Sequence, residues 1–341
     1  MVGKTGAHTQ FGRPPDHPAG AARGSGPVTV GRDEFEVIEA LRARFEAAGG
    51  PIGAGDLGIG DDAALVTPPG VGQVVLATDL VVEGVHVDLA TCGPEDVGWK
   101  ALMVTVSDVA AMGCDPSHVL LSVAAPAGFP IERLGDGVAA AASAAGCAVV
   151  GGDLASGPVL VVSVAVVGPV PDGPAPLRRS GARPGHRLLA TGRLGASAAG
   201  LRLLAGNPMA AGPAVDAHRR PVARLAEGRV ARLAGATAAV DVSDGLLADS
   251  THLALASGVG LDLAVGALLV APGATRDEAL AGGEDYELVL ATPDPDRLRA
   301  AFRDAGLAEP LDLGRCTDRP GEVLVDGEPV PPAAGGWRHR F

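Results

Sequence analysis

Aromatic residues and lysines are scarce in this chain. Only 3% of its 341 residues are aromatic, and Lys4 and Lys100 are its two lysines. Because 47% of the residues are hydrophobic, a large core can form, but it must be built from Val, Leu and Ala rather than from rings. A chain of this length suggests about two domains.

Positive charge is also lacking, since the formal net charge is -13 at pH 7 and the sequence pI is about 5.0. Nucleic-acid recognition needs a basic face, and anionic membranes attract basic segments. We therefore expect neither nucleic acid nor a membrane as a partner. An acidic protein can still bind phosphates, provided that metal ions or local arginines supply the positive charge.

Paired cysteines and long apolar runs are missing as well. The four cysteines form no C-x-x-C motif, which argues against zinc and against a redox dithiol, and scattered thiols fit a reducing cytoplasm. No stretch approaches the roughly 20 apolar residues of a membrane helix, and the first residues lack the apolar core of a signal peptide. We expect a cytoplasmic protein.

Hydrophobic periodicity predicts an α/β fold of mixed α+β character, with helices and strands alternating along the chain. Residues 1–32, which are rich in Gly, Pro and small polar residues, predict a mostly disordered tail. A Pro- and Gly-rich stretch at 169–185 predicts a boundary between domains at 33–172 and 173–341. Helices are expected at 33–47, 94–113, 131–146, from about 195, at 221–234, 246–257 and 295–306, and strands at 73–79, 117–126, 147–153, 158–168, 187–191, 237–244, 284–292 and in a hairpin at 322–330.

Acidic residues recur where an apolar segment meets glycine. The segments "GIGDDAALV" (58–66), "VVGGDLASG" (149–157), "VDVSDG" (240–245) and "AGGEDYE" (281–287) share this pattern. Strand ends and the loops after them gather at one rim of an α/β fold, so we expect these acids to meet. Each acid alone is more simply a turn residue or helix N-cap, as Asp244 before an apolar helix illustrates.

Converging carboxylates repel one another unless a positive charge lies between them. With few lysines and no Cys/His ligand set, the expected partner is a hard divalent cation, and oxygen-only ligation favours Mg²⁺ over zinc. Mg²⁺ held by separated acids usually also contacts substrate phosphates. The residues therefore point to phosphoryl transfer, in which metal ions neutralise and align the transferred group.

Seven segments in this order resemble the thiamine-monophosphate kinase family, within the superfamily named after aminoimidazole ribonucleotide synthetase, from about residue 33 onward. The resemblance implies a two-domain fold with a dimerising N-terminal sheet, a homodimer, and transfer of the ATP γ-phosphoryl group to thiamine monophosphate with several Mg²⁺ ions. Dependence on a monovalent cation is left open. The segments are "GIGDDAALV", "ATDLVVEGVHVDL", "GWKALMVTVSDVAAMGCDP", "VVGGDLASGP", "RSGARPGH", "VDVSDGLLADS" and "AGGEDYELVLA".

The resemblance also implies roles for individual residues, with no side chain acting as a general base because the acceptor phosphate is already anionic. Ala77 departs from the family, which often has a hydroxyl residue there. The implied metal ligands are Asp62, Thr78, Asp79, Asp108, Asp153, Asp241 and Asp244. The implied ATP contacts are Gly152, Asp153, Arg179 and Ser243. The implied contacts to the thiamine substrate are His86, Glu284 and Trp337.

Simpler interpretations remain for several of these residues. Arg179 could be a solvated linker residue, His86 a strand residue facing solvent, and Trp337 a cap on a hydrophobic edge. Lys100 is interpreted as a charge partner on the surface of its helix. Alternative functions are another ATP-dependent enzyme of the superfamily, such as the aminoimidazole ribonucleotide synthetase or hydrogenase-maturation type, and a non-catalytic nucleotide or metal sensor.

Overall fold

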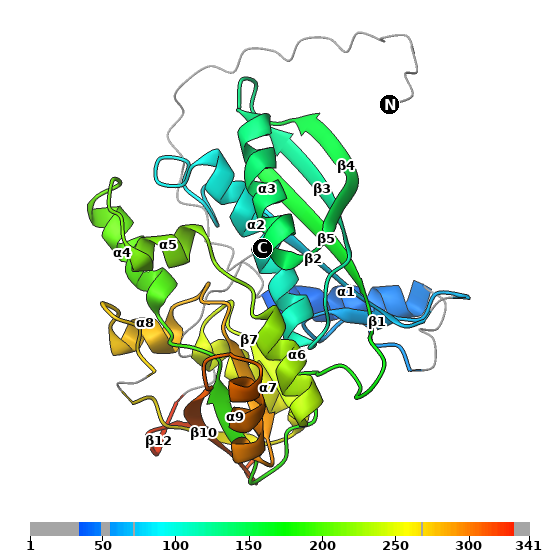
Figure 1. The fold of residues 1–341 in the computed structure, drawn as a ribbon, viewed down its shortest axis with the longest axis vertical. Coiled ribbons are helices and arrows are strands. Elements are labelled where there is room, and N and C mark those ends of the chain that lie inside the picture. Colours follow the sequence, from blue (N-terminus) through cyan, green and yellow to red (C-terminus); the bar gives the residue numbers. More distant parts are fainter. Residues whose placement is uncertain (1–33, 49–54, 71, 267–268, 331–341) are drawn as a thin grey trace, which may run out of the picture.

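The structure, a computed structural model, describes residues 34–48, 55–70, 72–266 and 269–330 (Figure 1). The predicted tail at 1–32 and Trp337 lie outside the described residues. Two mixed sheets, each with its own helices, make up the described part. The four cysteines, all described, are free thiols. Among the described residues, no helix is long and apolar enough to cross a membrane.

The first sheet has five strands in the order β1-β2-β5-β3-β4, and only the β3–β4 pair is parallel. In Figure 1, α2 and α3 lie side by side on one face of this sheet. Its elements are α1 (Glu34–Ala48), β1 (Ala64–Val66), β2 (Val74–Val82), α2 (Pro94–Ala111), β3 (His118–Ala125), α3 (Ile131–Ala145), β4 (Ala148–Ser156) and β5 (Val161–Pro169).

Two glycines let α2 and α3 cross at close range. A Cβ on Gly98 would lie 2.1 Å from the carbonyl oxygen of Leu134, and one on Gly137 would lie 2.0 Å from that of Glu95. Each helix therefore presents a bare backbone to the other at the crossing, which is a use for glycine inside a helix. The close packing buries α2 on most of its circumference.

The face of the first sheet opposite α2 and α3 is open and apolar. Leu76 and Leu80 on β2 and Leu120 on β3 are 37%, 52% and 51% exposed. Because side chains alternate along a strand, the residues between them on β2 and β3 point into the core under the helices. The helix-covered face therefore carries the core, and the open face is available to a partner.

The second sheet has seven strands in the order β12-β11-β8-β10-β6-β9-β7, and only the β11–β8 pair is parallel. Two hydrophobic clusters pack on its faces. Its strands are β6 (Arg187–Ala190), β7 (Ala238–Asp241), β8 (Gly260–Leu263), β9 (Leu288–Thr292), β10 (Leu311–Thr317), β11 (Val323–Val325) and β12 (Glu328–Pro329). Its helices are α4 (Ala196–Gly206), α5 (Pro213–Arg219), α6 (Leu225–Ala234), α7 (Leu246–Ser257), α8 (Arg276–Ala281) and α9 (Pro295–Asp304).

Helix α2 also packs against the second sheet's elements, on α6 and on the end of β7. A Cβ on Gly228 of α6 would lie 2.0 Å from the carbonyl oxygen of Ala110 on α2. This close approach fixes the last turns of α2 beside β7. It therefore brings acidic residues from the two halves of the chain to one place.

The mixed α/β class is confirmed, and most predicted elements are found within a few residues. The hairpin at 322–330 is confirmed, with Asp326 and Gly327 at φ 53° and 84°, as a two-residue turn of the I′ class requires. The strand predicted at 284–292 begins only at Leu288, because Glu284 and Tyr286 have φ of 66° and 53° and cannot continue a strand.

Other differences concern short segments. The helix predicted from 221 begins at Leu225, and the strand predicted to 244 ends at Asp241. Five further elements, β1, β8, β10, α5 and α8, are not predicted from the sequence. These elements have three to seven residues each, which is too short for hydrophobic periodicity to identify.

Candidate active site

Three carboxylates from distant parts of the chain form an acidic centre. Asp62 lies in the turn before β1, Asp108 lies on α2 and Asp241 ends β7. One carboxylate oxygen of each lies within 4.8 Å of the others. The acids meet as expected, but from a turn, a helix and a strand end rather than from one row of parallel strand ends.

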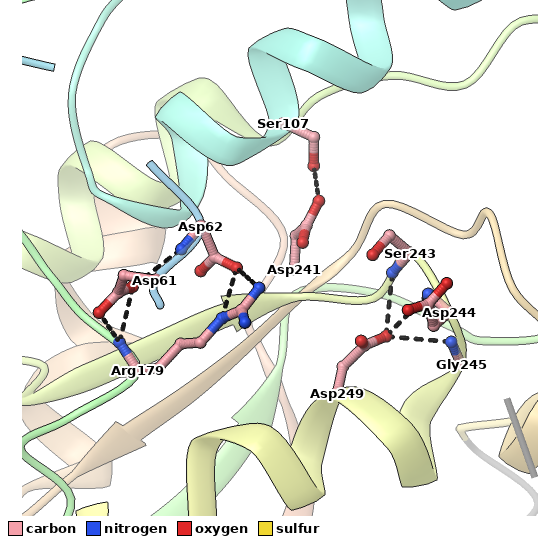
Figure 2. Close-up of polar contacts among 9 residues, drawn as sticks. All are labelled: Asp61, Asp62, Ser107, Arg179, Asp241, Ser243, Asp244, Gly245 and Asp249. Atoms are coloured by element: carbon pink, nitrogen blue, oxygen red, sulfur yellow. Dashed lines mark hydrogen bonds and ion pairs between the residues drawn. The ribbon is translucent and has the colours of Figure 1, made fainter. Parts of the chain in front are cut away.

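Arg179 is the cation bound to this centre. Its Nε and Nη2 donate to Asp62 Oδ1 at 2.8 and 2.5 Å, and its backbone N–H donates to both oxygens of Asp61 at 3.1 Å (Figure 2). The Arg179 side chain is 22% exposed and that of Asp62 is fully buried. The interpretation of Arg179 as a solvated linker residue is therefore wrong.

One carboxylate oxygen at the acidic centre accepts no hydrogen bond from the described residues. Asp62 Oδ2 is buried and has no hydrogen-bond partner in the described part of the chain. A buried carboxylate oxygen without a donor is unfavourable. It is an available ligand atom on a side chain that clusters with two other carboxylates.

Burial and mutual repulsion shift the acids of this region toward the protonated form. Burial, which outweighs the attraction of Arg179, raises the pKa of Asp62 to about 8. Burial and the charge of Asp241 raise the pKa of Asp79 to about 6, although Thr105 partly offsets this. Burial and the charges of Asp79 and Asp241 raise the pKa of Asp108 well above its ordinary value. A divalent cation would reverse these shifts by favouring the ionised forms.

Two further side chains hold the centre in place. Ser107 on α2 donates from Oγ to Asp241 Oδ2 at 2.5 Å. Figure 2 shows Asp249 of α7 reaching back to the turn before its own helix. Its Oδ2 accepts from the backbone N–H groups of Ser243, Asp244 and Gly245, each at 3.0 Å.

The N-cap interpretation of Asp244 is wrong. The N-cap residue of α7 is Gly245, and no side chain caps that position. The amides that an N-cap normally binds are instead bound by Asp249, from inside the helix. The Asp244 side chain is therefore left at the edge of a pocket.

A pocket of about 660 Å³ lies beside the acidic centre. Asp79 and Asp244 line the side nearest the carboxylates, and His86, Lys100 and Glu284 line another part. His86 is half-buried in a turn after β2, and its Nδ1 accepts from the backbone N–H of Val82 at 3.1 Å. The interpretation of His86 as a solvent-facing strand residue is therefore wrong.

Lys100 is not on a helix surface, contrary to the sequence analysis. Its side chain is 1% exposed, and its Nζ lies 2.7 Å from Glu284 Oε1. Glu284, in the segment 282–287 between α8 and β9, pairs with Lys100, so this lysine is buried rather than exposed on the helix surface. The backbone N–H of Glu284 donates to Ser243 O at 2.7 Å, which ties this segment to the acidic turn.

Three residues assigned by resemblance lie apart from the acidic centre. Thr78 is exposed, and its hydroxyl donates to Val164 O at 2.9 Å, on the face of β2 opposite Asp79. Gly152 and Asp153 lie on β4, the far edge strand of the sheet. Gly152 is required there, since a Cβ would lie 1.6 Å from Leu121 O.

Three contributors to the site, Ser107, His218 and Asp249, are not predicted from the sequence. Ser107 could have been suspected, because it directly precedes Asp108 in the "SD" pair. Asp249 lies in the first turn of α7, where an acid usually faces solvent. His218 on α5 comes from a helix that the periodicity did not reveal. Only the folded chain brings it to the pocket wall.

Family models match both halves of the chain. The model described as "AIR synthase related protein, N-terminal domain" matches residues 60–170, and the corresponding C-terminal domain model matches residues 183–327. Hydrogenase maturation protein HypE is similar at 20% identity and a TM-score of 0.63, covering 83% of this chain and 93% of its own. That likeness concerns the fold alone.

Two curated relatives are described as thiamine-monophosphate kinase. The protein of Mycobacterium tuberculosis H37Rv is 40% identical over 300 residues, which is 86% of this chain and 88% of the relative. The protein of Corynebacterium glutamicum is 35% identical over 335 residues, 92% and 95% of the two chains. Both alignments extend well beyond the segments that surround the acidic centre.

Solved structures agree with these matches. AaThiL complexed with AMPPCP and TMP superimposes with a TM-score of 0.78 at 33% identity, covering 90% of this chain and 97% of its own. Thiamine-monophosphate kinase from Stenotrophomonas maltophilia K279a gives a TM-score of 0.69 at 37% identity, with coverage of 87% and 98%. The similarity therefore includes both sheets and the site between them.

Proposed function

The chain belongs to the thiamine-monophosphate kinase family, and on that premise we propose that its acidic centre and pocket transfer the ATP γ-phosphoryl group to thiamine monophosphate. The product is thiamine diphosphate. The observation that carries this proposal is the position of the pocket, whose wall includes Asp79 and Asp244 beside the acidic centre. An organic phosphate bound there has its phosphate end next to the carboxylates.

The residues fit Mg²⁺. The donor set is oxygen only, which suits this ion. The buried Oδ2 of Asp62 has no hydrogen-bond partner in the described part of the chain, and Asp62 clusters with Asp108 and Asp241. We propose that these three residues, with Asp79 and Asp244 at the pocket, hold the metal. When bound, Mg²⁺ neutralises phosphate oxygens and aligns the donor and acceptor. The number of ions and a monovalent cation requirement stay predictions.

The side chains around the metal position need only bind and orient the reactants. Arg179 supplies a guanidinium, which is suited to phosphate oxygens, and we assign it with Ser243 to the ATP side of the site. Asp249 holds the turn that contains Ser243 and Asp244. No general base is required, because the acceptor phosphate oxygen is anionic at neutral pH.

We further propose that the chain forms a homodimer through the open face of the first sheet. The exposed leucines of β2 and β3, Leu76, Leu80 and Leu120, form an apolar surface of the kind that marks protein interfaces. Thr78 and Asp153 belong to that side of the sheet, so a second copy would cover them. Sedimentation of the wild type as a monomer at micromolar concentration would contradict this, whereas a Leu120→Glu variant that sediments as a folded monomer would support it.

The decisive experiment offers the purified protein Mg-ATP with one acceptor at a time. Thiamine monophosphate should be converted to thiamine diphosphate, and chelation of Mg²⁺ should stop the reaction. Thiamine and the ribonucleotide substrate of aminoimidazole ribonucleotide synthetase serve as control acceptors. Turnover of the ribonucleotide instead would favour that activity. ATP binding without any product over hours would favour a sensor.

A further inference from the structure

An ion pair in the pocket wall includes a buried lysine that has no assigned part in the reaction. Lys100, the single lysine among the described residues, is 1% exposed and places Nζ 2.7 Å from Glu284 Oε1. The same Nζ lies 3.3 Å from the backbone oxygen of His86. A buried ammonium is unfavourable unless it is paired and hydrogen-bonded, so its two partners fix the position of Lys100.

The other oxygen of Glu284 is held from a different direction. His218 Nδ1 lies 3.3 Å from Glu284 Oε2 and 3.0 Å from Ser197 Oγ. Burial and the charge of Lys100 lower the pKa of His218 to about 4, so the ring is neutral at physiological pH. The Glu284 carboxylate therefore contacts Lys100 of α2 through one oxygen and His218 of α5 through the other. A quarter of the Glu284 side chain remains exposed in the pocket.

The backbone conformation of Glu284 also restricts where its carboxylate can lie. Its φ of 66° is uncommon for a residue other than glycine, and such conformations persist where the surrounding structure holds them. The bond from its N–H to Ser243 O sets its distance from the acidic turn. A carboxylate that is fixed by its backbone, an ammonium and an imidazole has one orientation to offer a ligand.

We propose that Lys100 and His218 are positioning residues that orient the Glu284 carboxylate toward the cationic, nitrogen-containing ring system of the acceptor. This rests on the proposed function. Lys100 also bonds the backbone at His86, so one side chain sets the spacing between two parts of the pocket wall. Lys100 and His218 therefore affect binding of the organic part of the acceptor. They do not affect ATP binding or the transfer of the phosphoryl group.

The test compares Lys100→Met with the wild type. Methionine keeps the buried stem and removes the ammonium, and Glu284 can rehydrate because it is partly exposed. We expect KM for thiamine monophosphate to rise about tenfold or more, with KM for ATP and kcat within about twofold. Arg229→Met, which breaks the exposed Arg229–Asp115 pair, is the control and should change none of these.

His218 provides a second, independent comparison. Asparagine can place a donor where His218 Nδ1 lies, so His218→Asn should retain most acceptor affinity, whereas His218→Leu should lose it. If Lys100→Met fails to fold, the comparison of His218→Asn with His218→Leu still tests the positioning role. Equal changes in both KM values, or an unchanged KM for thiamine monophosphate in Lys100→Met and His218→Leu, would overturn the proposal.

Calorimetric binding separates this inference from the proposed function. If the wild type binds thiamine monophosphate without phosphorylating it, and Lys100→Met weakens that binding, the positioning role stands and the kinase activity does not. If the wild type phosphorylates the acceptor and Lys100→Met binds it equally well, the kinase activity stands and the positioning role does not. Absence of both binding and turnover in the wild type would overturn both.

Discussion

Ser107 and Asp241, which are 134 residues apart, share a hydrogen bond of 2.5 Å from the serine Oγ to the carboxylate Oδ2. Ser107 belongs to the last turns of α2 and Asp241 ends β7, so the bond joins the two halves of the chain at the acidic centre. Both side chains are buried. The orientation of the Asp241 carboxylate therefore depends on a residue from the other sheet's helix.

Replacement of Ser107 by alanine should weaken metal binding without unfolding the protein. Asp241 would lose its donor and the orientation that the donor imposes. Loss of such an outer partner typically reduces metal affinity or activity by about 10–100-fold. Titration of activity with Mg²⁺ should show this as a higher half-saturating concentration.

Ser250→Ala is the matched control for Ser107→Ala. Ser250 is equally buried, but its Oγ has no hydrogen-bond partner in the described part of the chain. Its removal should leave the Mg²⁺ dependence unchanged. Identical Mg²⁺ titrations for Ser107→Ala and the wild type would show that the Ser107 bond does not support the metal site.

Asp62→Asn should abolish turnover while leaving the fold intact. The substitution keeps the shape and removes a charge that the metal-free protein holds unfavourably, since burial raises the pKa of Asp62 to about 8. We expect at least about a 100-fold loss of kcat/KM, equivalent to about 3 kcal/mol, with an unchanged or higher melting temperature without metal. Asp172→Asn, at an exposed position, should match the wild type, and full activity of Asp62→Asn would rule out the metal role.

The meeting of Asp62 with Asp241 could be predicted from the sequence, whereas the position of Asp153 could not. All three acids adjoin glycine or an apolar strand. That local pattern predicts where a strand ends, but it does not predict the position of that strand in the sheet. Since β4 lies at the edge opposite β1, Asp153 is carried away from the acidic centre despite the same pattern.

Lys100 shows a second limit of sequence reasoning. The helical period correctly places it two turns before Asp108 on α2. However, the period cannot state whether a polar side chain meets solvent or another segment. Here α3, α6 and both sheets surround α2, and the segment at Glu284, almost 200 residues later, covers the lysine. Burial of this kind depends on long-range topology alone.

Stability should depend on pH in a direction set by the acidic centre. The pKa values of Asp62 and Asp79 rise from an ordinary 3.8 to about 8 and about 6 on folding. From about pH 4 upward the unfolded chain ionises these groups while the folded chain retains their protons, so the stability of the metal-free protein should fall until about pH 8.

Mg²⁺ should reverse this trend, because it binds the ionised carboxylates and must compete with protons. We expect the rise in melting temperature on adding MgCl₂ to be larger at about pH 8.5 than at about pH 6. Thermal unfolding with and without MgCl₂ at both pH values measures this. The Asp62→Asn variant should lose most of the difference, and a larger effect of Mg²⁺ at the lower pH would contradict the assignment.

Two glycines of α3 provide a test of the helix crossing that supports the site. Gly137→Ala should be strongly destabilising, because the added Cβ would lie 2.0 Å from Glu95 O on α2 and the helices would have to separate. Overpacking of this kind costs about 1–3 kcal/mol or more.

Gly135, on the same helix, provides the control, because it has no atom within 4 Å of an added Cβ. Gly135→Ala should therefore stabilise the protein by up to about 1 kcal/mol through helix propensity. Chemical denaturation of both variants measures the difference, and similar unfolding free energies would show that α2 and α3 do not depend on backbone contact at Gly137.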